Sequence, residues 1–399
     1  MPPMNVSVFT IGRFHHYDLS RQILRLGHHL RLFTSNPRVK VDEGLWPYTQ
    51  THPLYRVPFA IGNRLGLGAH LYWLDEALLK DLARWLTRSL DPNWTEIFHA
   101  LDGVGPQPGR KIKAAGKLWI CDRGNSHITA QKQLLDDEYA LWNVPPPKFS
   151  PHRLARCAAE YEEAHAVTVP SQFARRTFLQ QGIPDERIFV CPYGVNLSEF
   201  RPAPKRDQIF RVLHVGQITV RKGIGHLLQA VEPLIRKGPL PRQVKVELWL
   251  IGETDSSVTR LLRQYSGIFE LKGIIPRKDL WKYYSQASVL VLASIEDGFG
   301  LVLAQAMACG LPIISTTNTG ADDLITNGVQ GFIVPIRSPE SIREKIQWML
   351  DNPAQRDQMA AAALERVKTL GGWDRYGDAV QSVYNQLAAR HNTSHHVTQ

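Results

Sequence analysis

The stretch of this sequence with the clearest potential for chemistry is "SIEDGFGLVLAQAMACGLP", residues 294–312. Two adjacent acids precede a Gly-Phe-Gly turn, and an apolar helical run follows, directly after the strand-like "SVLVLAS". Backbone amides at the start of that helix would be free, and the helix dipole there favours phosphate or sugar hydroxyls. A purely structural turn with first-turn acids fits equally well. The candidate binding residues are Glu296, Asp297, Gly298, Phe299, Gly300 and Leu301.

A second stretch, "VGQITVRKG", carries the adjacent cations Arg221 and Lys222 just after another strand-like run. Two cations beside a helix start suit a diphosphate leaving group, because its negative charge grows as the bond to carbon breaks. A solvated basic turn is the more common fate of an Arg-Lys pair. The functional interpretation therefore depends on both stretches lying at one edge of a sheet.

The surrounding elements would bring them to such an edge. Short apolar runs such as "FRVLHVG", "VKVELWLIG", "SVLVLAS" and "LPIIST" alternate with segments of helical period, which is typical of a parallel sheet covered on both faces. The first half repeats the pattern in "MNVSVFTIG", "HLRLFTS", "EIFHALDG" and "KLWICDRG". We therefore expect an α/β protein with two doubly wound domains. Ligands of such sheets bind at the carboxyl ends of the strands.

The segment "CPYGVNLSEFRPAPKRDQ" separates the two halves and is rich in Pro, Gly and polar residues. We place a hinge at 196–208, a first domain at 1–195 and a second at 209–372. Two strand edges facing each other across this hinge would form a two-substrate cleft. The polar end, 391–399, is expected to be a flexible tail.

Composition narrows the class of protein. Of 399 residues, 43% are hydrophobic and 21% charged, as in an ordinary globular protein. The net charge of +10 is spread along the chain and favours anionic partners, but we find no nucleic-acid-binding motif. The four cysteines are scattered without a C-x-x-C pair, and no signal peptide or long apolar span is present. We expect a cytoplasmic protein.

At this point the sequence resembles the retaining family 4 glycosyltransferases of the GT-B fold, also called glycosyl transferases group 1. "PYGVNLSEFRP" resembles the family's hinge motif, "GQITVRKG" its phosphate loop, and "GIIPRKDLWKYYSQASVLVLAS" its base-contacting segment. "EDGFGLVLAQAMACGLPIISTTNTGADDLITNGVQGFIVP" resembles its donor-sugar region. The resemblance implies two Rossmann-like domains facing across a cleft, with a C-terminal helix, here 373–390, crossing back to the first domain.

The resemblance also assigns roles to residues. Asp297 matches the first of two family glutamates and is expected to contact the donor sugar, and Gln305 matches the second, which binds the ribose. Both residues depart from the glutamate, and Gln217 stands where many members have arginine. His127 in "CDRGNSHITAQ" is our choice for a catalytic contact from the first domain, with His15 and His16 as competitors. The remaining donor-binding candidates are Gly12, Gly216 and Ile274.

These assignments imply transfer of a sugar from a UDP- or GDP-sugar to an acceptor hydroxyl with retention of configuration, in polysaccharide or glycoconjugate biosynthesis. No D-x-D triplet is present, so we expect no metal and no cofactor, with Arg221 and Lys222 stabilising the diphosphate. Two alternatives stay open. One is a nucleotide-sugar-binding scaffold subunit, suggested by the two glutamines, and the other is an epimerase of the same fold.

The acceptor is expected to be a carbohydrate or a lipid-linked molecule. Residues 77–90, "ALLKDLARWLTRSL", carry an apolar face with cations off it. Such a helix suits peripheral contact with the inner face of a membrane, but packing against the first domain's sheet would give the same pattern.

Overall fold

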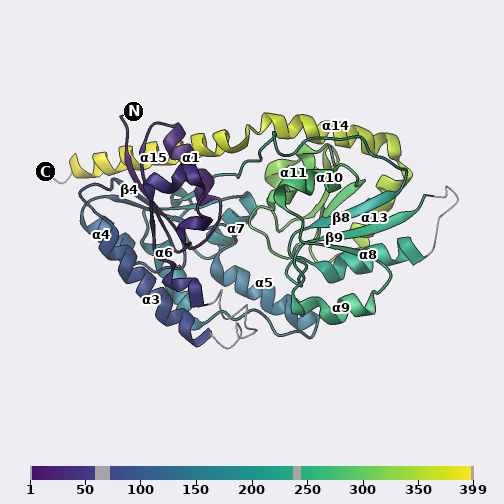
Figure 1. Cartoon of the computed structure of the whole chain (residues 1–399), viewed down its shortest axis with the longest axis horizontal. Coiled ribbons are helices and arrows are strands. Elements are labelled where there is room, and N and C mark those ends of the chain that lie inside the picture. The colour runs from purple at the N-terminus through teal and green to yellow at the C-terminus, as the bar shows by residue number, and fades with distance from the viewer. Residues whose placement is uncertain (1, 59–71, 237–243, 397–399) are drawn as a thin grey trace.

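A computed structural model describes residues 2–58, 72–236 and 244–396 of the chain. Its described strands form one sheet in each half, with the orders β3-β2-β1-β4-β5-β6-β7 and β10-β9-β8-β11-β12-β13. Neighbouring strands of both sheets run parallel, with helices packed around them (Figure 1). The predicted α/β fold of two doubly wound sheets is therefore confirmed.

The strands of the first sheet follow the order of the chain. They are β1 (Asn5–Thr10), β2 (His29–Thr34), β3 (Thr49–Thr51), β4 (Ile97–Leu101), β5 (Leu118–Asp122), β6 (Ala166–Val169) and β7 (Ile188–Val190). Those of the second sheet are β8 (Phe210–Val215), β9 (Val246–Ile251), β10 (Glu270–Gly273), β11 (Val289–Leu292), β12 (Ile313–Thr316) and β13 (Gly331–Val334). The long apolar runs of the sequence became the central strands, because helices cover both faces of each sheet.

Helices connect the strands within each half. The first half contains α1 (His16–Arg25), α3 (Tyr72–Ser89), α4 (Gln107–Ala114), α5 (Ile128–Leu141), α6 (Pro151–Glu163) and α7 (Gln172–Gln180). The second contains α8 (Ile224–Arg236), α9 (Thr259–Gln264), α10 (Leu280–Tyr284), α11 (Leu301–Ala308), α12 (Ala321–Leu324), α13 (Pro339–Asp351) and α14 (Pro353–Thr369).

A long final helix, α15 (Gly372–His396), lies along the first domain, beside α1 (Figure 1). Its Tyr384 hydroxyl lies 2.9 Å from Nδ1 of His99 on β4, and Gln22 of α1 donates to Asp374. The helix runs past residue 390, where the sequence interpretation placed a flexible tail. His391 contacts the backbone oxygen of Gly116 at 2.9 Å, which helps to hold this end. Residues 397–399 of the expected tail lie outside the described residues.

The helix considered for membrane contact, α3, packs into the first domain. Leu79, Leu82 and Leu86 are buried against the sheet, and Trp85 stacks on His52 with ring centroids 5.0 Å apart. The apolar face of α3 is therefore a core face. Among the described residues, no helix combines the length and apolar character needed to cross a bilayer.

Candidate functional site

The two chemically suggestive stretches meet at the carboxyl edge of the second sheet. They follow β8 and β11, which are neighbours in the sheet, and the Ile295 N–H donates to the backbone oxygen of Arg221 at 2.9 Å. The Lys222 ammonium forms an ion pair with Asp297. Residues from adjacent strands thus place two cations and two acids in one cluster, as the sequence predicted for the edge of a parallel sheet.

The Lys222 and Asp297 side chains are mostly buried. Burial lowers the pKa of Lys222 below its ordinary value, although Asp297 acts in the opposite direction. Burial would raise the pKa of Asp297, but the Lys222 ammonium and the Arg221 guanidinium outweigh it and hold the pKa low. Asp297 is therefore ionised at neutral pH, and an anionic ligand could replace it as the partner of Lys222.

Glu296 faces the first domain. Its carboxylate is fully buried and accepts hydrogen bonds from the Ser126 backbone and hydroxyl at 3.0 and 2.8 Å, and from the Gln131 amide at 2.9 Å. Arg221 donates to its other face through Nε at 2.9 Å. The interpretation of Glu296 as a donor-binding residue is therefore wrong, because four donors already occupy its carboxylate. It links the two domains instead.

The Gly-Phe-Gly turn lies against the first domain as well. A Cβ on Gly298 would lie 2.0 Å from the backbone oxygen of Gly124, so only glycine allows this approach. Ser171 donates to the Gly298 oxygen at 2.6 Å. The Gly300 N–H, expected to be free, donates to Asp297 at 3.1 Å, and the Phe299 side chain is buried. The turn thus serves as a junction between the domains.

Of the remaining candidates in the second domain, Gln305 and Ile274 are the most open to a ligand. The Gln305 side chain is half-buried and accepts from the Tyr284 hydroxyl at 2.9 Å, so its amide NH2 has no described partner. Ile274, just past β10, is 74% exposed and offers an apolar surface to a flat ring. Gln217 is also exposed. These placements suit recognition of a nucleoside, which has a flat base and a hydroxyl-bearing ribose.

Two predicted glycines hold their loops together. Gly216 follows β8 with φ 135°, and its backbone oxygen lies where a Cβ on Gly252 would clash. Gly12 follows β1, where a Cβ would lie 2.9 Å from the Arg56 guanidinium. Both glycines therefore have a packing reason for their type.

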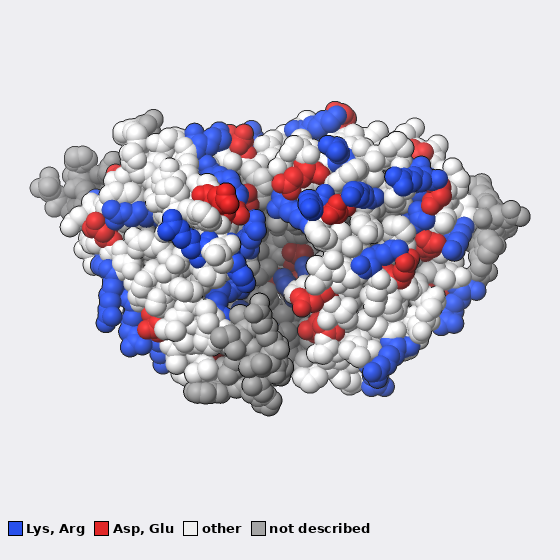
Figure 2. All heavy atoms as spheres, viewed as in Figure 1, with Lys and Arg blue, Asp and Glu red and all other residues white. Residues whose placement is uncertain are grey.

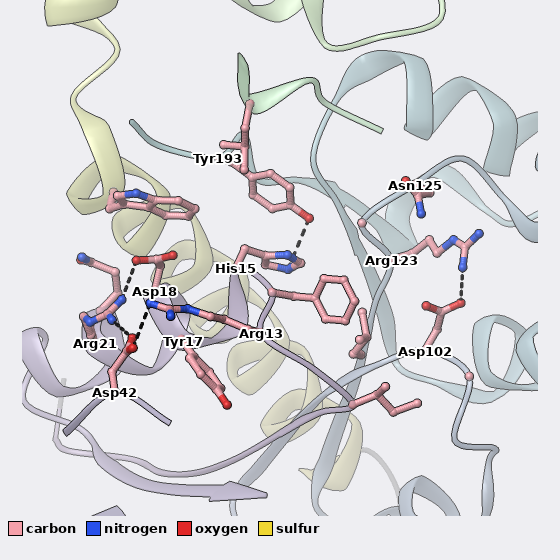
Figure 3. A pocket seen from close by; sticks show the side chains of 18 of the residues that line it. Arg13, His15, Tyr17, Asp18, Arg21, Asp42, Asp102, Arg123, Asn125 and Tyr193 are labelled. Atoms are coloured by element: carbon pink, nitrogen blue, oxygen red, sulfur yellow. Dashed lines mark hydrogen bonds and ion pairs between the residues drawn. The ribbon is translucent and has the colours of Figure 1, made fainter. Parts of the chain in front are cut away.

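A cavity of about 1110 Å³ opens between the two domains, and Figure 2 shows the molecule hollowed there. Its first-domain wall includes Arg13 and Asp18, beside α1, while Arg277 and Leu301 come from the second domain. Figure 3 shows Arg13 and Arg21 pointing toward Asp42 and Asp18 across this wall. Such a polar, charged wall can hold a hydroxyl-rich molecule through many directed hydrogen bonds.

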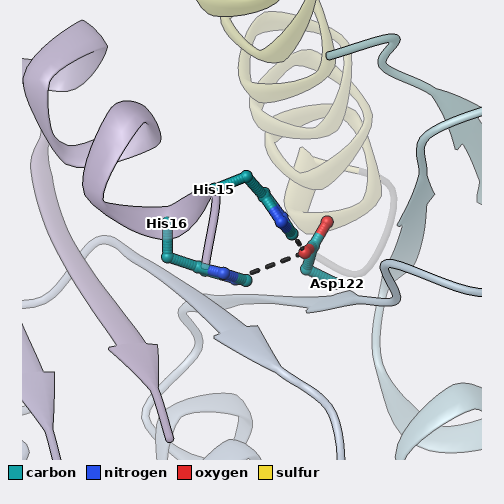
Figure 4. Close-up of side chains that lie close together, drawn as sticks. All are labelled: His15, His16 and Asp122. Atoms are coloured by element: carbon teal, nitrogen blue, oxygen red, sulfur yellow. Dashed lines mark hydrogen bonds and ion pairs between the residues drawn. The ribbon is translucent and has the colours of Figure 1, made fainter. Parts of the chain in front are cut away.

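The histidine at this wall is His15. It is the residue before α1, its ring stacks on Tyr193 with centroids 4.2 Å apart, and its Nε2 lies 2.5 Å from the buried Asp122 carboxylate. Figure 4 shows His15 and His16 both directed at Asp122. Burial would raise the pKa of Asp122, but the surrounding histidines, His15 first, hold it well below its usual value.

His127, our sequence choice, lies elsewhere. It precedes α5, its Nδ1 accepts from the Thr129 N–H at 3.2 Å, and its ring packs between Tyr161 and Phe178. It is not among the described residues that line the cavity. Burial, with help from the Arg123 guanidinium, lowers the pKa of His127 to about 4, so the ring is neutral. This placement favours a structural role and moves the first-domain histidine of the site to His15.

Two buried clusters carry side chains of metal-ligand type. They are His15, His16 and Asp122, and, deeper in the first domain, Asp102, Cys157 and Glu160. Hydrogen bonds already engage the acids, since Asp122 accepts from Thr168 at 2.6 Å and Glu160 from the Gly103 and Gly105 amides at 2.6 and 2.7 Å. Metal-independent catalysis stays a prediction.

Two facing Rossmann-like sheets with the site between them define the GT-B class of proteins. Sucrose-phosphate synthase from Thermosynechococcus elongatus has the same fold, with a TM-score of 0.74 and 21% identity over 97% of this chain and 100% of that one. HepE of Anabaena, solved in complex with UDP-glucose, matches with a TM-score of 0.70 and 15% identity over 96% and 100% of the two chains.

Residues 197–366 match the family model described as glycosyl transferases group 1, so the second half of the chain belongs to that family. The D-inositol 3-phosphate glycosyltransferase of Nocardiopsis dassonvillei is 30% identical over 235 residues, which are 54% of each chain. The chain thus spans about half the length of that curated relative. The family predicted from the motifs is confirmed.

Proposed function

We propose that this protein transfers a sugar from a nucleotide diphosphate sugar to the hydroxyl of an acceptor held in the cavity between the domains. The observation that carries the proposal is the meeting of Lys222 and Asp297 at the ends of β8 and β11, beside the start of α11. There Lys222, with Arg221 behind it, would stabilise the departing diphosphate. Asp297 would accept hydrogen bonds from the hydroxyls of the donor sugar.

The nucleoside would lie against Ile274, with its ribose near Gln305. The solved HepE complexes, which contain UDP or UDP-glucose, support a uridine nucleotide, and a GDP-sugar is the alternative. The acceptor would bind between the wall at Arg13 and Asp18 and the His15 ring. The described site holds no free carboxylate placed as an enzymic nucleophile. We therefore propose retention of configuration, with the acceptor attacking on the face of the leaving group and its proton passing to a diphosphate oxygen.

The test is the thermal stabilisation of the purified protein by UDP, GDP and ADP in the presence of EDTA. A ligand that binds only the folded state raises the melting temperature by mass action. We expect one nucleotide to raise it and the shift to persist in EDTA, because cationic side chains stand where a metal would otherwise act. A shift that appears only with added Mg²⁺ would overturn the metal-independent part, and no shift with any nucleotide would overturn the donor site.

The scaffold alternative is not favoured by any contact in the site. Gln305 keeps a hydrogen-bonding amide toward the solvent side, and Lys222 stands beside its acid partner. Binding without turnover in the same assay, followed by product analysis with the matching nucleotide sugar, would be the result that supports it.

A further inference from the structure

A second hollow lies on the outer side of the first domain, between α3, α4 and α6. It has a volume of about 790 Å³, and its floor is apolar, formed by Leu79, Ala83, Val104 and Ala159 among others. Leu79 and Arg156 line both this groove and the cavity between the domains. A single elongated ligand could therefore place an apolar part in the groove and a polar part in the cavity.

The rim of the groove is cationic. Lys80, Arg84 and Arg88 lie four residues apart on one face of α3 and are exposed, so they form a straight row along the groove. Neither Lys80 nor Arg88 has an ion-pair partner within the described parts of the chain, and Arg84 has only Asp81 at 3.9 Å. Like charges at this spacing repel and weaken a helix, so the row is better explained by an anionic partner than by folding.

The neighbouring helices add to this surface. Arg110 of α4 lies at the rim, although Glu163 pairs with it, and Lys113 follows one turn further. Figure 2 shows Lys and Arg side chains gathered along this edge of the first domain, over the helices labelled α3 and α4 in Figure 1. The only acid that lines the groove, among the described residues, is Glu76, and Arg156 neutralises it at 2.7 Å.

We propose that the groove binds the lipid phosphate of a lipid-linked acceptor. Its hydrocarbon chain would lie on the apolar floor, its phosphate against the row on α3, and its polar head would pass Arg156 into the cavity. An apolar floor with a cationic rim matches an amphiphile with a negative head, and cations near an anionic lipid strengthen binding further. This inference rests on the proposed function, because it names the class of acceptor for that site.

The experiment is a calorimetric titration of the full chain with dihexanoyl phosphatidic acid, a lipid phosphate soluble as single molecules. Dihexanoyl phosphatidylcholine and inorganic phosphate are the comparison ligands. We expect saturable binding of phosphatidic acid, at least about tenfold tighter than either comparison ligand, because only phosphatidic acid offers both an apolar chain and a net negative head. Inorganic phosphate binding as tightly would overturn the lipid assignment.

Two matched double variants test the location. Lys80→Gln with Arg88→Gln is expected to weaken phosphatidic acid about tenfold or more, whereas Arg260→Gln with Arg263→Gln, which removes two exposed cations from α9, changes it less than about twofold. Ala155→Trp, which fills the groove without changing charge, should abolish binding. Equal weakening by the two pairs would mean unspecific attraction and would overturn the proposal.

A nucleotide titration separates this proposal from the proposed function. UDP, or whichever nucleotide stabilises the protein, should bind the groove variants as it binds the unchanged protein, because the groove lies away from Lys222. If nucleotide binds and phosphatidic acid does not, the lipid inference fails alone. If no nucleotide binds, the donor site fails, whatever the lipid result.

Discussion

Gly298 faces the backbone oxygen of Gly124 so closely that a Cβ on Gly298 would lie 2.0 Å from it. This approach joins the donor turn of the second domain to the loop after β5 of the first. It fixes the position of Asp297, one residue before the contact, relative to the cavity wall.

Gly298→Ala should force the two loops apart, because the obstructing atoms are backbone atoms and cannot rotate away. We expect turnover to fall by about tenfold or more, since an error near 1 Å in positioning has that order of cost. Gly44→Ala is the matched control, because a Cβ added at Gly44 would have no other atom within 4 Å. Steady-state kinetics of both variants checks this, and equal activity of the two would show that the junction does not position the site.

Glu296→Gln should destabilise the protein by about 3 kcal/mol, because it breaks a buried ion pair with Arg221 and a network of neutral donors. Urea unfolding measures the loss. Glu270→Gln is the control, since this carboxylate is 59% exposed and its pair with Lys272 should contribute below about 1 kcal/mol. A Glu296 variant as stable as the control would contradict the role of that residue in linking the domains.

His127→Asn should leave turnover nearly unchanged, because asparagine can still accept the Thr129 N–H at the start of α5. His15→Asn, in contrast, should lower turnover by about tenfold or more, because it removes the ring that stacks on Tyr193 in the cavity wall. Kinetics of the pair decides between the two histidines. A large loss in His127→Asn without loss of folding would restore the sequence assignment.

The pH dependence of stability gives a separate test of the same residue. The pKa of His127 falls from 6.5 to about 4 on folding, so the unfolded chain binds the proton more readily. The stability from this group is present above pH 6.5 and is lost as the pH falls toward 4, by at most about 3 kcal/mol. Urea unfolding of His127→Asn between these pH values should therefore show a weaker loss than the unchanged protein, and an identical loss would contradict the burial of a neutral ring.

Gln305→Glu should tighten nucleotide binding by about fivefold, because a carboxylate accepts a stronger hydrogen bond from a ribose hydroxyl than an amide does. The Tyr284 hydroxyl can donate to either side chain. Gln305→Met, which removes the polar group, should weaken binding. Calorimetry of both variants measures the change, and unchanged affinity in both would place the ribose elsewhere.

Much of the fold could be predicted because continuous apolar runs mark strands buried on both faces. The edge strands β3 and β7 escaped prediction, since three residues carry too little pattern to identify. The neighbours Glu296 and Asp297 could not be told apart in sequence. Their different roles arise because Ser126 and Gln131, from the other domain, surround only one of them.

The choice of histidine failed for a similar reason. His15 and His127 both stand in a turn before a helix, and a sequence does not show which turn faces the cavity. Asp122, at the end of the strand "LWICD", is the signal that could have favoured His15, because a buried acid at that edge needs a partner. Pairing across separate strands is long-range information that local patterns lack.

The most direct test of the central claim is a calorimetric titration with the stabilising nucleotide diphosphate in EDTA, using the unchanged protein and Lys222→Met. Lys278→Met, which removes an exposed lysine, is the control. We predict metal-free binding that Lys222→Met weakens about tenfold or more for the diphosphate but hardly at all for the nucleoside, because the ammonium meets the phosphates. Equal affinity of the diphosphate for Lys222→Met and Lys278→Met would contradict the account.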